Sequence, residues 1–263
     1  CSIDSVPNRG YCLHRPESAL SDAAVRALLE GCPWPINVLP TVDSTNTYAK
    51  AQAALGAPHG SVYITGRQTG GRGRRGRTFV SPPGGVYLSV LLRPQREAAE
   101  LLWLTAAVAV AIRRAIRDCC PADVGIKWTN DLVIGKRKVC GILTEAVTDF
   151  ESGDIDFAVV GIGLNLYEAE GGYPSEIRNV AGALYENREA AAGLDRNRLA
   201  AEIINALLEE TRELRLPPEY IQQNLVPGRE IQIVDGQDIR KAKALEICPD
   251  GRLKVQESDG SLS

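Results

Sequence analysis

The chain is poor in the residues that build metal and disulfide sites. In 263 residues it has two histidines and no methionine, and its seven cysteines form no C-x-x-C pair. A zinc site is therefore not expected, and an odd number of cysteines is typical of free thiols in a reducing cytoplasm. From the start at Cys1 and the lack of methionine we expect either a fragment or a chain whose methionines are missing from the printed sequence.

Several common functional motifs are also missing. The sequence has no G-x-x-x-x-G-K-[ST] loop and no G-x-S-x-G turn, which argues against a Walker-type nucleotide site and a serine hydrolase. A near-match to G-x-G-x-x-G at 71–76 is followed by Pro82 and Pro83 rather than by a helical pattern, so a dinucleotide fold fits poorly. No apolar run reaches membrane-spanning length, and the first residues lack a signal-peptide pattern.

One short segment is strongly cationic. Residues 70–77, GGRGRRGR, hold four arginines and four glycines, although the whole chain has 30 basic and 33 acidic residues. Glycine lets the backbone approach a ligand closely, and arginine grips phosphate or carboxylate. Because the net charge is -3, this segment is a local device for binding an anion. A nucleic-acid-binding segment is one alternative.

The pattern of elements predicts an α+β fold with a mixed sheet. The expected helices cover 21–29, from the capping run 41–46 to about 55, 97–118 and 197–215, and the expected strands cover 61–65, 85–92, 124–128, 139–147, 156–166, 229–234, 240–247 and 252–258. We expect strand 85–92 to be half-buried. We also expect Gly135 to Lys138 to close a hairpin between 124–128 and 139–147.

Three regions follow from these patterns. Residues 1–20 are polar and broken by prolines and a glycine, so we expect a linker or the remnant of another domain. Residues 21–223 are expected to form the main α+β domain. Residues 224–263 are expected to form a small β-barrel-like domain, because short strands replace helices after Pro217 and Pro218.

The remaining polar residues are mostly binders of anions and amides. They are Ser44, Thr45, Asn46, Gln68, the arginines of 70–77, Lys127, Asn130, Asp131, Lys138 and Asn165. This set has no evident general acid or nucleophile. It suits a reaction that depends on positioning and charge neutralisation, such as attack of a carboxylate on the α-phosphate of a nucleotide. Taken singly, each residue also has an ordinary explanation, such as a helix cap at Ser44 or a solvated surface lysine at Lys138.

Six motifs occur in a fixed order. They are DSTN (43–46), QTGGRGRRGR (68–77), SPPGGVYLS (81–89), KWTNDL (127–132), RKVCGILTE (137–145) and GIGLN (161–165). Together they resemble biotin protein ligases, also called biotin–[acetyl-CoA-carboxylase] ligases. The resemblance implies a class II aminoacyl-tRNA-synthetase-like domain, and the run GREIQIV implies an SH3-like C-terminal domain that stops short of its last strand. The implied activity is ATP-dependent formation of biotinyl-5'-adenylate and transfer of biotin to a lysine of a biotin carboxyl carrier protein.

The resemblance also implies residue roles. The biotin-contacting positions would be Ser44, Thr45, Asn46, Gln68, Arg72, Gly73, Arg74, Lys138 and Gly141. Lys138 would be the main catalytic cation, between the biotin carboxylate and the α-phosphate, with Arg74, Arg77 and Lys127 assisting. ATP would contact Arg74, Arg77, Phe79, Asn130, Asp131 and Asn165, and Asn130 and Asn165 would hold magnesium.

The sequence departs from the family pattern at two places. Thr129 stands where the family usually has proline, and Phe79 stands where it commonly has a tryptophan against adenine. Residues 8–21 resemble the wing end and linker of the N-terminal winged helix that some members use to repress biotin synthesis genes. The full protein would then be of this bifunctional type. We expect no DNA binding by this fragment and no membrane association, and a homodimer is a further expectation.

Two other functions are weighed against this one. Lipoate or octanoyl transferases share the catalytic fold, but their pocket must hold a long acyl chain and they lack the arginine-rich loop. A nucleic-acid-binding module would instead bind with steep salt dependence and without biotin.

Overall fold

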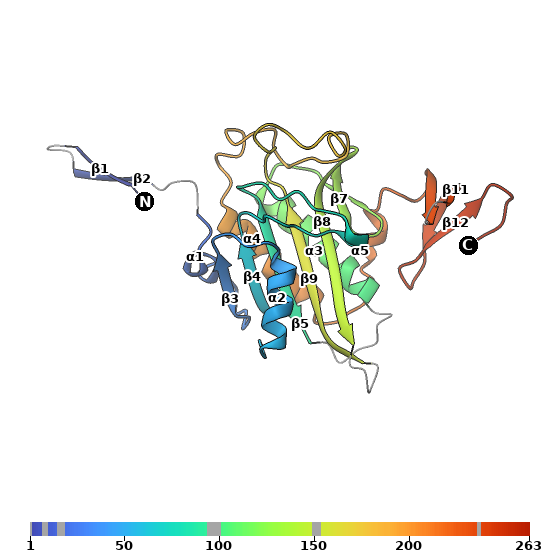
Figure 1. The fold of residues 1–263 in the computed structure, drawn as a ribbon, viewed down its shortest axis with the longest axis horizontal. Coiled ribbons are helices and arrows are strands. Elements are labelled where there is room, and N and C mark those ends of the chain that lie inside the picture. The colour runs from blue at the N-terminus through green and yellow to red at the C-terminus, as the bar shows by residue number, and fades with distance from the viewer. Residues whose placement is uncertain (1, 7–9, 15–18, 94–100, 149–153, 236–237) are drawn as a thin grey trace.

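A seven-stranded mixed sheet lies at the centre of the structure, a computed structural model that describes residues 2–6, 10–14, 19–93, 101–148, 154–235 and 238–263 (Figure 1). Its strands lie in the order β3 (Ile36–Leu39), β4 (Ser61–Thr65), β5 (Val86–Leu92), β9 (Ile155–Leu164), β8 (Arg137–Thr148), β7 (Asp131–Ile134) and β6 (Gly125–Lys127). Strands β3 and β4 are parallel, and the other neighbouring pairs are antiparallel. The predicted α+β class is confirmed.

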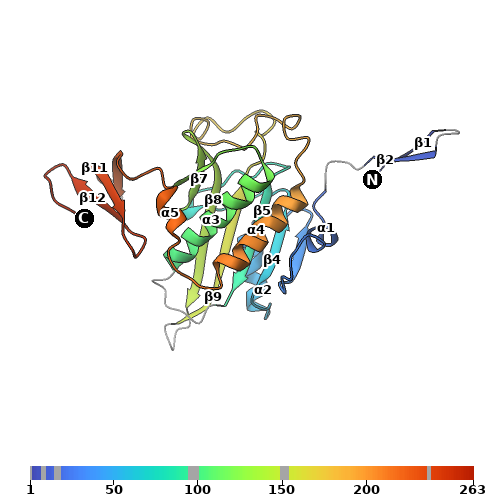
Figure 2. The same cartoon turned by 180° about the vertical axis from the view of Figure 1, so that it is seen from behind.

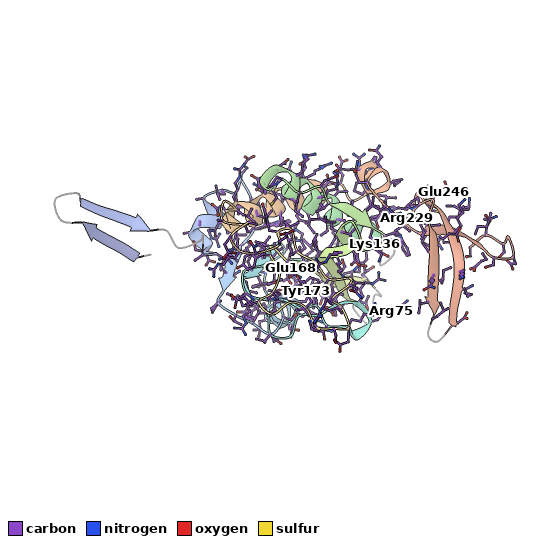
Figure 3. All side chains as sticks on the ribbon, turned by 90° about the horizontal axis from the view of Figure 1, so that it is seen from above. Arg75, Lys136, Glu168, Tyr173, Arg229 and Glu246 are labelled. Carbon is purple, nitrogen blue, oxygen red and sulfur yellow. The ribbon has the colours of Figure 1, made fainter. Side chains whose placement is uncertain are left out.

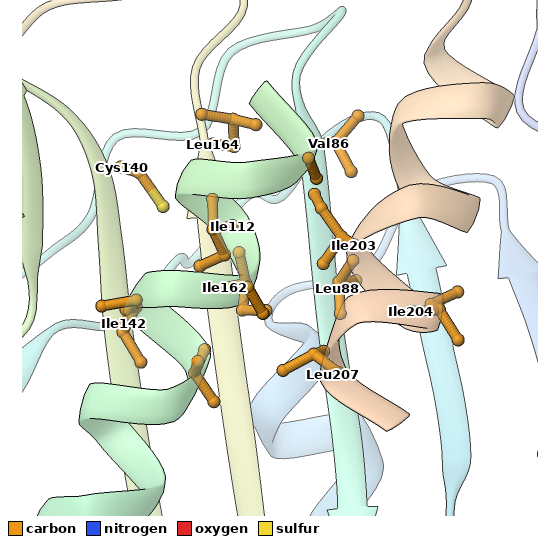
Figure 4. Packing of buried hydrophobic residues seen from close by; sticks show 14 of the residues in the cluster. Val86, Leu88, Ile112, Cys140, Ile142, Ile162, Leu164, Ile203, Ile204 and Leu207 are labelled. Carbon is orange, nitrogen blue, oxygen red and sulfur yellow. The ribbon is translucent and has the colours of Figure 1, made fainter. Parts of the chain in front are cut away.

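Two long helices cover one face of the sheet (Figure 2). They are α3 (Leu101–Cys119) and α4 (Arg196–Glu210), with the short helices α1 (Asp22–Arg26) and α5 (Pro218–Gln222) beside them. Figure 4 shows aliphatic side chains of these helices, such as Ile112 and Leu207, packed over the sheet. Each such fully buried side chain contributes about 1.5–3 kcal/mol to folding, so this layer is the main core. Residues 97–100 of the predicted third helix lie outside the described part of the chain.

The helix α2 (Thr45–Ala54) covers the opposite face (Figure 1). Ala49 and Ala53 pack there against Tyr63, Leu91 and Phe157 in a second, smaller cluster. Strand β5 is therefore buried along its whole length, and the expectation that it would be half-buried was wrong. Its residue types alternate because its two faces pack against different helices, α3 and α4 on one side and α2 on the other, and neither face is exposed to solvent.

Side-chain caps set the starts of the predicted helices. Ser21 accepts a hydrogen bond from the N–H of Ala24, and Ser44 accepts one from the N–H of Thr47. These bonds satisfy backbone donors that have no partner within the helix. The Ser44 cap also fixes the position at which the first turn of α2 meets the sheet.

The predicted hairpin has a different partner. Gly135 and the residues after it do close a turn, but the turn joins β8 to β7 rather than to the strand at 124–128. Strand β7 was not expected, because it is only four residues long and begins at Asp131, directly after the turn-forming residue Asn130. Strand β6 then pairs with β7 at the edge of the sheet.

Small β-structures lie at both ends of the chain (Figure 1). The segment expected to be a linker carries an antiparallel hairpin of β1 (Ser2–Val6) and β2 (Gly10–His14). At the other end, β10 (Glu230–Asp235), β11 (Asp238–Ile247) and β12 (Leu253–Glu257) form a three-stranded antiparallel sheet, as predicted, while its SH3-like character stays a prediction. Trp128 ties this sheet to the central domain by donating from Nε1 to the carbonyl of Gly251 at 3.0 Å. Among the described residues, none of the helices has the length and apolar character to cross a membrane.

Candidate active site

A pocket opens on the face of the sheet that α2 covers, with about 420 Å³ of space in it and its mouth. Three glycines of β8 and β9 line the pocket and leave room for the side chains that form its other walls. A Cβ atom on Gly161 would overlap Oδ1 of Asn46, and one on Gly163 would lie 2.5 Å from the ring of Phe79. At Gly141 it would lie 2.8 Å from Cε of Lys138. The pocket is lined by Ser44, Thr45, Asn46, Gln68, Arg72, Gly73, Arg74, Phe79, Asn130, Lys138, Gly141, Ile142, Leu143, Gly161, Ile162 and Gly163.

Polar side chains form a connected network at the floor of the pocket. The backbone N–H and the hydroxyl of Thr45 both donate to Oε1 of Gln68, at 2.8 and 3.1 Å. The amide nitrogen of Gln68 donates to Oγ of Ser81 at 2.8 Å. The buried hydroxyl of Ser89 lies 2.8 Å from Oγ1 of Thr45 and 2.6 Å from Oδ1 of Asn46. Because each of these groups is held by protein, the floor is preorganised for a polar ligand.

A carboxylate of β8 lies beside this network. Glu145 accepts a hydrogen bond from Nδ2 of Asn46 at 2.9 Å and pairs with Lys50 of α2 at 2.8 Å. Arg72 reaches the same carboxylate at 3.4 Å. Burial tends to raise the pKa of Glu145, but the hydrogen bonds from Lys50 and Asn46 and the charges of Lys50 and Arg72 outweigh it. The pKa of Glu145 is therefore below its ordinary value, and the side chain is ionised at neutral pH.

One lysine projects into the pocket from β8. The ammonium group of Lys138 lies 5.6 Å from the centre of the Phe79 ring and 2.6 Å from Oδ1 of Asp131. Its backbone is fixed from outside the sheet, because its N–H donates to the carbonyl of Val180 and its carbonyl accepts from the N–H of Gly182. The lysine is thus a positioned cation at the wall of the pocket.

The arginine-rich segment closes one side of the pocket. Its short helical turn, η1 (Arg74–Gly76), is held at its base by the N–H of Gly73, which donates to the carbonyl of Arg77. Arg74 donates to Oδ1 of Asn130 at 3.2 Å, and the amide of Asn130 in turn donates to the carbonyl of Ile142. Arg75 is exposed, and Figure 3 shows it at the rim of the central body. Two arginines of the segment, at 72 and 74, therefore face the pocket.

The structure does not bring every predicted residue to the pocket. Of the predicted set, Arg77, Lys127, Asp131 and Asn165 are not among the lining residues. Arg77 and Lys127 are exposed, and Asp131 lies behind Lys138. Asn165 is buried, where its oxygen accepts from the hydroxyl of Tyr87 at 2.9 Å. Burial, and then the charges of neighbouring tyrosines, keep the pKa of Tyr87 well above its ordinary value, so that hydroxyl stays a donor.

Other residues of the site had no predicted role. The floor uses Ser81 and Ser89, and the carboxylate cluster uses Lys50 and Glu145. Both serines and Glu145 lie inside the quoted sequence motifs, so position in a motif was an available signal for them. Lys50 lies in the Ala-rich helix, and no feature of the sequence distinguishes it from a solvated surface lysine.

Comparisons with known proteins identify related sequences. The sequence model of the Biotin/lipoate A/B protein ligase family matches residues 38–165. A biotin–[acetyl-CoA-carboxylase] ligase of Mycobacterium tuberculosis is 31% identical over 251 residues, which cover 90% of this chain and 88% of that protein. The bifunctional ligase/repressor BirA of Escherichia coli is 32% identical over 84% of this chain, but the match spans 64% of that longer protein. The chain thus spans less than two thirds of this bifunctional relative.

The fold is similar to that of solved structures. A biotin protein ligase from Aquifex aeolicus in complex with biotin and ATP superposes with a TM-score of 0.72 at 25% identity, covering 87% of this chain and 94% of that chain. The apo structure of the Aquifex protein gives a TM-score of 0.68 at 22% identity.

Proposed function

The chain belongs to the biotin protein ligase family, and on that premise we propose that it activates biotin with ATP and transfers it to a lysine of a carrier protein. In the first step a biotin carboxylate oxygen bonds to the α-phosphorus of ATP and pyrophosphate leaves, which gives biotinyl-5'-adenylate. In the second step the lysine amine loses a proton, attacks the acyl carbon and releases AMP. The observation that carries the proposal is the pocket that joins a fixed amide-binding floor to Lys138 and two arginines.

The two halves of the pocket suit the two ends of biotin. The floor built by Thr45, Asn46 and Gln68 places polar groups, held by bonds within the protein, where a ureido ring could bind, and the polar groups of that ring must be satisfied once buried. Lys138 would bind the carboxylate and the α-phosphate together, and so reduce the repulsion between nucleophile and electrophile. Gly141 leaves room for the lysine and the ligand at the wall.

The cationic loop suits the phosphates. Arg74 already faces the pocket through Asn130, and Arg77 lies one turn further along the same loop. We assign these arginines to the phosphates, and Phe79 to the adenine as a stacking face. Lys127, Asp131 and Asn165 lie outside the pocket lining, so their roles as ATP contacts remain predictions that require rearrangement on binding.

The two predicted magnesium ligands do not fit a direct metal site in this arrangement. Oδ1 of Asn130 lies 3.2 Å from the guanidinium of Arg74, a cation that would repel a second one. Oδ1 of Asn165 is buried against Tyr87. Across the described residues no three His, Cys, Asp or Glu side chains form a group that could hold a metal ion. We therefore assign no step to the ion, which is commonly bound through nucleotide phosphates.

The wider roles are proposals of the same kind. The carrier would be the biotin carboxyl carrier protein of acetyl-CoA carboxylase, since two relatives bear the name biotin–[acetyl-CoA-carboxylase] ligase. We also propose a cytoplasmic location, residues 1–20 as linker or winged-helix remnant, and an SH3-like fold for 224–263. Repressor activity would belong to the longer bifunctional form, and the homodimer remains a prediction.

The test is transfer to an acceptor. The protein is incubated with ATP, magnesium, biotin and a purified biotin carboxyl carrier domain, and the acceptor is weighed by mass spectrometry. We expect one biotinyl group on one lysine, and no gain when that lysine is replaced by arginine. A parallel incubation with octanoate or lipoate distinguishes the acyl-transferase alternative, because transfer of these acids and not of biotin would contradict the proposal. Tight DNA binding that does not depend on biotin would favour the nucleic-acid alternative.

A further inference from the structure

Glu145 lies next to the pocket but is not among its lining residues. Its side chain is 22% exposed, and both of its oxygens are engaged. One oxygen accepts from Nδ2 of Asn46, and the other faces Lys50 and Arg72. Among the contacts of Glu145, the one that reaches the hydrogen-bonded floor of the pocket is the bond from Asn46.

The partners of Asn46 decide how its amide is oriented. The two ends of an asparagine amide have nearly the same shape, so the hydrogen-bond network determines which end points where. The nitrogen of Asn46 donates to the carbonyl of Leu143 at 3.2 Å and to Glu145 at 2.9 Å. Both partners can only accept. A flipped amide would place an oxygen against two acceptors, which is unfavourable in a buried site.

The orientation leaves an acceptor toward the pocket. Oδ1 of Asn46 lies 2.6 Å from the hydroxyl of Ser89 and directly over Gly161, which lines the pocket. Both N–H groups of the Asn46 amide are used by the protein, while its oxygen has a second lone pair. The side chain is 3% exposed, so no water-facing arrangement competes.

We propose that Glu145 is a positioning residue that holds the Asn46 amide with its oxygen toward the pocket, so that the floor accepts a ureido N–H. This inference rests on the proposed function, since the ureido ring is the end of biotin assigned to the floor. Ionisation at neutral pH keeps the carboxylate an acceptor only. Lipoate and octanoate have no N–H to offer, so this arrangement also selects between substrates that share the fold.

The test uses Glu145→Gln in the whole protein. The new amide has nearly the same shape but donates as well as accepts, so it no longer opposes a flipped Asn46. We expect the KM for biotin in pyrophosphate exchange to rise about tenfold, with the KM for ATP within about twofold and kcat largely kept, as expected when uniform binding is lost. Discrimination between biotin and biotin methylated on its ureido nitrogens should shrink by a similar factor.

Two control variants separate orientation from charge. Asp156→Asn makes the same change in β9 at a carboxylate that pairs with Arg93 at 3.0 Å, away from the pocket, and should leave the KM for biotin unchanged. Lys50→Gln removes the ion pair but leaves Glu145 an acceptor, so its KM for biotin should stay within about threefold of wild type.

Three outcomes would overturn the inference in a wild-type protein that is active with biotin. The first is an unchanged KM for biotin in Glu145→Gln. The second is an equal loss in Lys50→Gln, which would assign the effect to the ion pair. The third is equal binding of biotin and the methylated analogue by the wild type, which decides the matter even if the variant does not fold. A wild type without any biotin-dependent exchange would contradict the proposed function instead.

Discussion

Lys138 and Asp131 form an ion pair across the neighbouring strands β8 and β7, with 2.6 Å between Nζ and Oδ1. The contact lacks the geometry of a directed hydrogen bond. Lys138 lines the pocket, whereas Asp131 lies behind it. The carboxylate thus restrains the cation in the ligand-free site while leaving its donors available to a ligand carboxylate or phosphate.

The first prediction concerns this cation. Lys138→Ala should lower the rate of biotin-dependent pyrophosphate exchange by about 100-fold or more, because a preorganised cation at the reacting groups contributes several kcal/mol. Lys136→Ala, in the exposed turn two residues earlier, is the matched control and should keep its activity. Near-normal exchange in the Lys138 variant would mean that this lysine is only a surface residue.

The second prediction concerns the glycine under the floor. Gly161→Ala should displace the Asn46 side chain, because the new Cβ atom would overlap its Oδ1. We expect biotin binding to weaken by about tenfold or more, the effect of one lost hydrogen bond in a buried site. Gly193→Ala meets no atom within 4 Å and should bind biotin normally by isothermal calorimetry. Normal binding in both variants would contradict the placement of biotin on this floor.

The residues of the pocket could be predicted from sequence better than their contacts. The order of the motifs predicted Ser44, the arginine-rich loop and Lys138 as site residues, and Ser44, Arg72, Arg74 and Lys138 all line the pocket. The bond between Asn46 and Glu145 joins residues 99 positions apart, and no local spacing determines it. Arg77 and Lys127 were predicted as site residues because they are cationic and lie in motifs, yet neither lines the pocket.

In the fold, too, features with a local sequence pattern could be predicted, whereas features that depend on contacts between distant residues could not. Periodicity located the long helices and most strands, since burial imposes it along the chain. Strand β7 was missed because four residues between two turn signals are too few for a pattern. The full burial of β5 depends on α2 lying over it, which only the tertiary structure shows.

The third prediction concerns the arginine-rich loop. Arg72 and Arg74 each make one partly exposed side-chain contact to the rest of the protein. The glycines of the loop add a cost in conformational entropy of about 1 kcal/mol or more for each residue that becomes ordered. Amide hydrogen exchange over residues 67–79 should slow when biotin and ATP are added. Arg74→Gly should form the adenylate but release it more readily, so that bystander lysines are labelled. Equal exchange with and without ligand would contradict a closing loop.

The fourth prediction concerns the tie to the C-terminal sheet. Trp128→Phe removes the donor to the carbonyl of Gly251 and should lower the free energy of unfolding by about 1 kcal/mol. Trp103→Phe is the matched control, because the buried Nε1 of Trp103 has no hydrogen-bond partner among the described residues, and loss of this N–H should be neutral or slightly stabilising. Equal effects of the two changes in urea unfolding would argue against the tie.

The fifth prediction concerns pH. The pKa of Glu145 is lowered in the folded protein, so its contacts favour folding above the ordinary value of 4.5 and lose this effect as the pH falls through the lowered pKa. The difference in Tm between wild type and Glu145→Gln should therefore be largest near neutral pH and shrink on acidification below about pH 4. A difference that stays constant with pH would mean that the charge of Glu145 does not contribute.

The most direct test of the central claim is to look for the activated intermediate. The protein is incubated with biotin and Mg-ATP without any acceptor, and the protein-bound fraction is analysed by mass spectrometry. We predict biotinyl-5'-adenylate bound to the protein in the wild type, with one pyrophosphate released per site, and formation slowed by about 100-fold or more in Lys138→Ala. A wild-type protein that binds both substrates but forms no adenylate would contradict the proposed function.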